Sequence, residues 1–178
     1  EAPGSCAGVH DLQALLTARY GSEEEEAVDA NDFAVMRLMG EAAEYAVAKI
    51  VAAMGDADMA MQRWGCGMYL RLASVQYHVT SDAGNMERLL VAASGCLERM
   101  RSAGCTGLND VKWRLRLYEG YVPGIRGDYE MALALLQALE ADFADSPRAQ
   151  LMTATLNNIG NALESKGEHD KAVEYFTR

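Results

Sequence analysis

The sequence predicts an all-α protein, built as an α-solenoid in which about eight helices stack as antiparallel pairs. Half of the 178 residues are apolar, yet aromatic residues make up only 7% and prolines number 3. Alanine, leucine, methionine and valine fill most of the apolar positions, a mixture that favours helix over sheet. Apolar side chains recur at steps of three and four, and a pair of helices recurs roughly every 40–46 residues.

The N-terminal part predicts one short helix followed by an acidic turn. The helix ends at Gly21, and its apolar face repeats at helical spacing. Its apolar positions are Val9, Leu12, Leu16 and Tyr20. Ser22 precedes glutamates at positions 23–26, which we interpret as a solvated turn rather than as a site for a metal or a cationic ligand. Residues 1–30 make up this first segment.

Residues 31–108 contain three predicted helices. The first is a long amphipathic helix that Gly55 and Asp56 end, with a break near Gly40 as an open alternative. Its apolar positions are Phe33, Met36, Met39, Ala43, Val47, Ile50 and Met54. Asp58 can cap the second helix, and the third follows after a short turn. Their stripes are Met61, Trp64, Met68, Leu72 and Val75, then Met86, Leu89, Ala93, Cys96, Leu97 and Met100. Methionine at this spacing indicates core packing.

The next predicted helix is apolar around most of its circumference between Val111 and Tyr121. Such a helix should lie between neighbours, since no face is suited to water. Trp113 within it, like Trp64 earlier, is interpreted as a large aromatic packed between helices, with an interface anchor as the alternative. Pro123 and the glycine after it are expected to end the helix.

Three more helices complete the prediction. Asp128 caps the first, Ser146 and Pro147 begin the second, and Gly167 separates the second from the last, which starts near Glu168. Their apolar positions are Tyr129, Ala132, Leu136, Leu139 and Phe143, then Met152, Leu156, Ile159 and Leu163, then Ala172, Val173 and Phe176.

A repeat is visible in this last third, because several residues recur after a displacement of 40. The matched pairs are Gly120 and Gly160, Gly127 and Gly167, Ala132 and Ala172, and Leu136 and Phe176. The stretch 156–176 resembles a tetratricopeptide repeat of the kinesin light chain type. In that motif Gly160 lets two helices approach, Gly167 turns the chain, and small Ala172 lies where the helices cross.

Residues 113–147 resemble a second, divergent copy, in which Pro123 departs from the pattern. We therefore assign 109–178 to tetratricopeptide-like repeats, the last of them incomplete. Residues 31–108 resemble armadillo or HEAT repeats. These families form superhelices that hold proteins or peptides on a concave face, and they are not enzyme families. The resemblance therefore implies a scaffold or adaptor that binds a protein or peptide, with no catalytic residues and no cofactor.

The same resemblance implies a partner-binding site on the helix that precedes Gly167. In tetratricopeptide repeats the first helix lines the groove, and an asparagine just after the motif glycine contacts a peptide; here that residue is Asn161. Asn157 lies four residues earlier on the same helical face, and Glu164 lies further along the helix. Side-chain amides offer a peptide backbone both donors and acceptors. The alternative is that these residues are simply exposed or bond to a neighbouring helix.

Charge and composition exclude several other classes of function. The formal net charge of -10 repels nucleic acid and acidic membranes, and no apolar stretch is long enough to insert into a bilayer. We expect a cytoplasmic protein without a metal site. Cys66 and Cys96 fall within helices, where they are interpreted as small buried hydrophobes, and His169 lies in a turn with no arrangement for catalysis.

Two other functions stay open. The chain could be a structural subunit of a large assembly, since the short final helix needs a cover for its apolar side from further sequence or from another chain. Alternatively, it could be the regulatory helical region of an enzyme whose catalytic domain is absent from this sequence.

Overall fold

A computed structural model describes residue 14 and residues 42–53, 55–143 and 149–178. Within these ranges every regular element is a helix, so the predicted all-α class is confirmed. The described helices are one over residues 42–53, α3 (Met59–Val79), α4 (Ala83–Ser102), α5 (Asn109–Ile125), α6 (Tyr129–Asp142), α7 (Ala149–Ser165) and α8 (His169–Thr177). The predicted helix and acidic turn of residues 1–30, the break near Gly40 and the Ser146–Pro147 cap lie outside the described residues.

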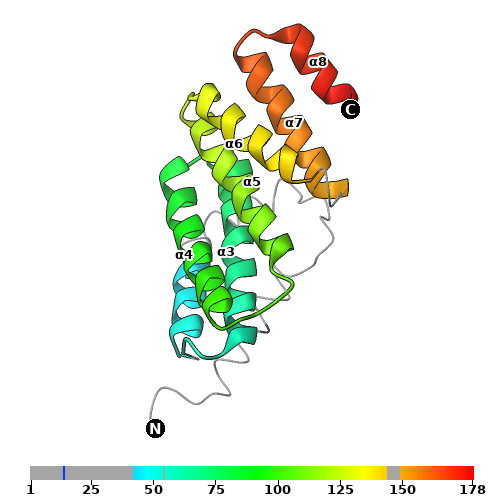
Figure 1. Cartoon of the computed structure of the whole chain (residues 1–178). Coiled ribbons are helices and arrows are strands. Elements are labelled where there is room, and N and C mark those ends of the chain that lie inside the picture. Colours follow the sequence, from blue (N-terminus) through cyan, green and yellow to red (C-terminus); the bar gives the residue numbers. More distant parts are fainter. Residues whose placement is uncertain (1–13, 15–41, 54, 144–148) are drawn as a thin grey trace.

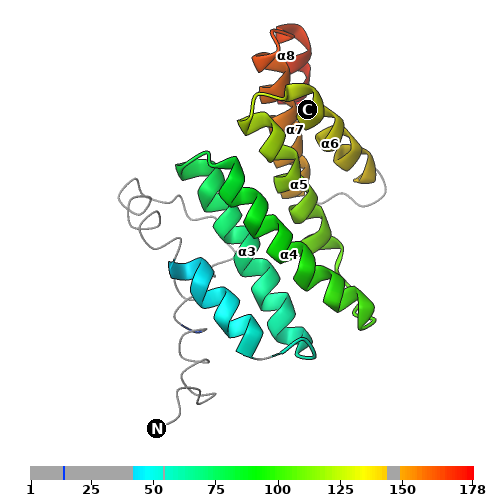
Figure 2. The ribbon, with the colours of Figure 1, turned by 90° about the vertical axis from the view of Figure 1, so that its left-hand side faces the viewer.

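The helices follow one another in space in the order of the sequence. Figures 1 and 2 show α3 and α4 beside the helix over residues 42–53, α5 and α6 next, and α7 and α8 at the far end. The pairs α3–α4, α5–α6 and α7–α8 each pack as a hairpin. Between the pairs, α4 contacts α5 and α6 contacts α7. The helices α3, α5 and α7 also contact one another in succession, so they form one row of the molecule.

Aspartate caps begin three of the helices. The side chain of Asp58 accepts from the backbone N–H of Met61 at 3.0 Å, and Asp128 accepts from Met131 at 3.0 Å, as the sequence predicts. Asp82 caps α4 in the same way. These carboxylates satisfy first-turn N–H groups that no helical carbonyl can reach.

The predicted end of α5 at Pro123 is wrong. The helix continues through Pro123 to Ile125, and the chain turns only at Gly127, whose φ is +81°. Proline lacks the N–H that would donate to the carbonyl of Glu119, a loss that normally interrupts a helix. Here the two residues before it, Tyr121 and Val122, are buried, so packing of the last turn holds the helical conformation.

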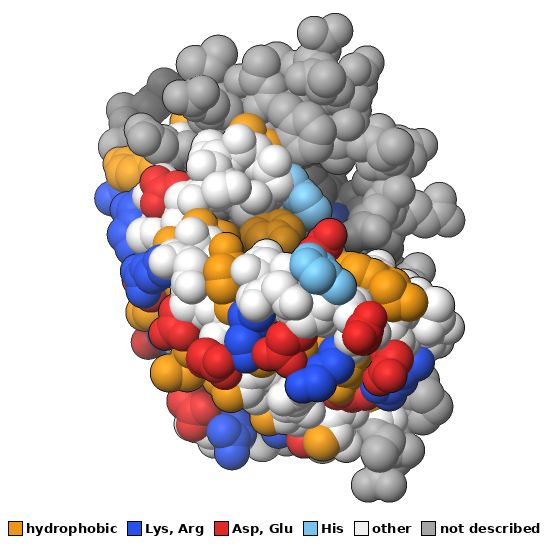
Figure 3. Space-filling view, turned by 90° about the horizontal axis from the view of Figure 1, so that it is seen from above, with side chains coloured by type: hydrophobic (Ala, Val, Ile, Leu, Met, Phe, Trp, Pro, Cys, Tyr) orange, Lys and Arg blue, Asp and Glu red, His pale blue; other side chains and the backbone are white. Residues whose placement is uncertain are grey.

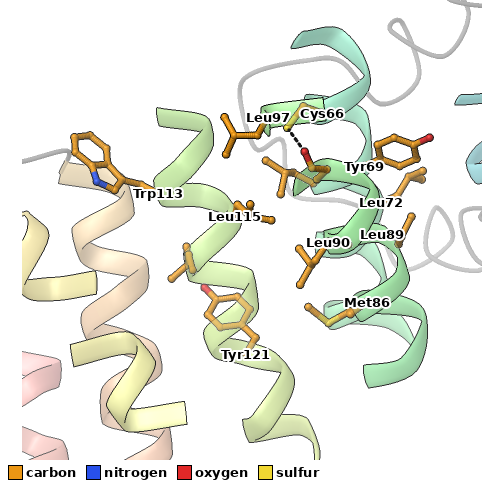
Figure 4. Close-up of a cluster of buried hydrophobic side chains, with 14 of the residues drawn as sticks. Cys66, Tyr69, Leu72, Met86, Leu89, Leu90, Leu97, Trp113, Leu115 and Tyr121 are labelled. Carbon is orange, nitrogen blue, oxygen red and sulfur yellow. Dashed lines mark hydrogen bonds between the residues drawn. The ribbon is translucent and has the colours of Figure 1, made fainter. Parts of the chain in front are cut away.

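One hydrophobic core runs through the described helices. It is continuous across residues 108 and 109, the predicted boundary between the armadillo-like and the tetratricopeptide-like segments. In Figure 4, Leu90 and Leu97 of α4 face Leu115 of α5, whereas Trp113 points from α5 toward the opposite side. The predicted packing role of the methionines is confirmed for Met61, Met68, Met86 and Met100, which are all buried. Trp113 is buried as expected, and Trp64 is partly buried against the same core.

The hairpins α5–α6 and α7–α8 have equivalent geometry after a displacement of 40 residues. In each turn the amide after the glycine donates to a carbonyl five residues earlier, from Asp128 to Pro123 and from Glu168 to Leu163, both at 2.9 Å. Gly127 and Gly167 have φ values of +81° and +80°.

The close contacts between the paired helices match as well. An added Cβ at Gly120 would collide with Leu136, and one at Gly160 would collide with the ring of Phe176. Ala132 and Ala172 are both buried, each with an exposed fraction of 2%. The displacement found in the sequence therefore corresponds to two similar hairpins.

None of the helices in the described ranges combines the length and apolarity that a membrane span requires.

Candidate functional site

The three residues predicted to bind a partner lie on one exposed stripe of α7. Asn157, Asn161 and Glu164 are all exposed, at steps of four and three along the helix. The opposite side of α7 is buried. Its buried side chains are Thr155, Leu156, Ile159, Ala162 and Leu163. The structure thus brings the predicted site residues together as a polar surface on a helix whose opposite side packs against the core.

The neighbouring amide, Asn158, has a different environment that the sequence analysis missed. Its Nδ2 donates to the hydroxyl of Tyr121 at 2.9 Å and to the carbonyl of Ala154 at 2.8 Å. Its Oδ1 accepts from the hydroxyl of Tyr77 at 3.1 Å. Asn158 therefore joins α7 to both α3 and α5. The sequence does carry a signal for this environment, namely the position of Asn158 in the helical period. Asn158 follows buried Thr155 by three residues and precedes buried Ala162 by four.

Aromatic rings surround this amide and extend the network. The rings of Tyr77 and Tyr121 lie 4.5 Å apart, and Tyr118 meets Tyr121 edge-on at 5.6 Å. Burial raises the pKa of Tyr77, so its hydroxyl keeps its proton and continues to donate to Asn158 at neutral pH. We call the four side chains Tyr77, Tyr118, Tyr121 and Asn158 the tyrosine–asparagine cluster. It fixes the row α3, α5, α7 from which the exposed stripe of α7 projects.

Replacing Asn158 by alanine is expected to lower the free energy of unfolding by about 1–2 kcal/mol, because it removes hydrogen bonds that link three helices and leaves partly buried hydroxyls without this amide. Urea unfolding followed by circular dichroism measures the change. Asn157→Ala is the matched control, since it deletes an adjacent but exposed amide and should change stability by less than about 0.5 kcal/mol. Equal effects of the two variants would contradict the linking role of Asn158.

The turn after α7 carries a compact group of charges. Lys166 contacts Glu130 of α6 at 2.6 Å and Glu168 at 2.9 Å, and Lys171 contacts Glu168 at 2.7 Å. Hydrogen bonds from Lys171 and Lys166 lower the pKa of Glu168 to about 2, so this carboxylate stays ionised at neutral pH. His169 beside it is exposed at the first position of α8.

The two helical cysteines are buried, as the sequence analysis expects. The thiol of Cys66 donates to the carbonyl of Ala93 at 3.2 Å. Burial, reinforced by the nearby Cys96, raises the pKa of Cys66 to about 12. Burial also raises the pKa of Cys96, against the opposing effect of Arg99. Both thiols are therefore protonated at neutral pH and are poor nucleophiles.

The raised pKa of Cys66 predicts a pH effect with a definite sign. In the unfolded chain the thiol loses its proton near pH 9, whereas the folded protein holds it to about pH 12. The contribution of this pKa difference to the free energy of unfolding is therefore complete below pH 9. It is lost as the pH rises from 9 to 12, by up to about 1.4 kcal/mol per pH unit.

The measurement compares urea unfolding of the wild type and of Cys66→Ala between pH 8 and pH 10.5. The wild type should lose stability more steeply with pH, and parallel curves for the two proteins would contradict the prediction. Labelling by a soluble disulfide reagent gives a second check. In a Cys6→Ser, Cys105→Ser variant, the two remaining thiols should react only when the protein unfolds.

The arginines of α4 do not form an unpaired basic face. Arg88 pairs with Glu44, Arg99 with Asp56, and Arg101 with Glu98. Seen from above, at the end of the molecule where α7 turns into α8, acidic and basic side chains lie next to one another in a band of the described surface (Figure 3). Among the described residues, no three histidine, cysteine, aspartate or glutamate side chains come together as a metal-binding group.

Comparison with known proteins leaves the family open. No protein-family model, no curated protein and no solved structure matches this chain. The resemblance to tetratricopeptide, armadillo and HEAT repeats therefore stays a prediction that rests on residues of the sequence.

Proposed function

We propose that this chain is a protein-interaction scaffold, in which helical pairs stack as an α-solenoid and the exposed stripe of α7 binds a peptide or a partner subunit. The observation that carries the proposal is the position of Asn157, Asn161 and Glu164 on one exposed face of a helix whose opposite side is buried. The tyrosine–asparagine cluster supports it, because a helix tied to two neighbours presents its side chains in a fixed arrangement.

The spacing of the two amides suits an extended peptide. Residues four apart on a helix are about 6 Å apart along its axis, and alternate residues of an extended chain are about 6.6 Å apart. Asn157 and Asn161 can therefore bond to backbone groups of the peptide at alternate residues. Glu164 at the end of the stripe, together with the net charge of -10, favours a peptide with a basic side chain.

The equivalence of the hairpins α5–α6 and α7–α8 supports the solenoid part of the proposal. Repetition of one hairpin along an axis produces an elongated surface that exposes the same helix of each pair. The stripe lies on α7, the last helix of the row α3, α5, α7. The resemblance of residues 109–178 to tetratricopeptide repeats points to the same mode of binding.

A library of extended peptides tests the proposal, with affinity measured by fluorescence anisotropy. Asn161→Ala should weaken binding of a selected peptide by about fivefold, the effect of one hydrogen bond of about 1 kcal/mol. Gln137→Ala is the matched control, because Gln137 is an exposed amide on α6, outside the stripe. Binding that is unchanged by Asn161→Ala, or weakened equally by Gln137→Ala, would refute the assignment of the site.

A further inference from the structure

We draw no further inference here: the strongest candidate, the exposed apolar patch that Met131 and Leu135 form on one side of α6, carries none because nothing in the described part of the chain shows what covers it.

Discussion

Replacing Phe143 by alanine is expected to lower the free energy of unfolding by about 3–5 kcal/mol, the cost of removing a fully buried aromatic ring. Phe143 lies at the C-cap of α6 and is buried in the core. Its ring meets that of Trp113 edge-on, with centroids 5.3 Å apart, so the substitution removes an aromatic pair between α5 and α6 as well as apolar burial.

Urea unfolding measured by circular dichroism and by tryptophan fluorescence checks this expectation. Phe176→Ala is the matched control, because it removes the same ring from the last helix, where the side chain is partly exposed. Its effect should be less than half as large, because the partly exposed ring buries less apolar area when the chain folds. Comparable losses in the two variants would show that Phe143 does not occupy a buried site.

Replacing Gly120 by valine is expected to lower the free energy of unfolding by about 3 kcal/mol, through overpacking between α5 and α6. A Cβ at Gly120 would lie 2.7 Å from Cδ2 of Leu136 and 2.9 Å from its Cγ. Leu136 is itself buried, so it cannot move aside without displacing its neighbours in the core. The two helices must separate or the leucine must leave its preferred rotamer, and both changes disrupt the core.

Gly67→Val is the control for this substitution. Gly67 lies within α3, and an added Cβ there would meet no atom within 4 Å. The change should alter stability by less than about 1 kcal/mol, and the exchange of glycine for a better helix former acts in the stabilising direction. If Gly67→Val were as harmful as Gly120→Val, the close approach at Gly120 would not be the cause.

Much of the fold could be predicted because the signals for it are local. Asp58 and Asp128 cap helices through contacts three residues away, and Gly127 and Gly167 turn the chain through their own φ values. The buried stripe from Met86 to Met100 follows from spacing alone. The all-α class and the 40-residue displacement can therefore be predicted from the sequence alone.

Sequence-based prediction fails where a contact between distant residues outweighs a local preference. Pro123 normally ends a helix, but burial of the preceding turn carries α5 onward to Ile125. Asn157 and Asn158 are identical in type and adjacent in sequence. Only the positions of Tyr77 and Tyr121, 81 and 37 residues away from Asn158, make one amide a structural link and leave the other exposed.

The sequence by itself determined the helical class of the described segments and which side of each helix is apolar, because hydrogen bonding and side-chain period act over a few residues. The tertiary structure decided which of those apolar sides are covered. Leu136 and Phe176 hold equivalent positions in equivalent hairpins, yet Leu136 is buried and Phe176 is partly exposed. The difference lies in whether another helix packs against the hairpin, since burial depends on neighbours that the residue's own segment does not encode.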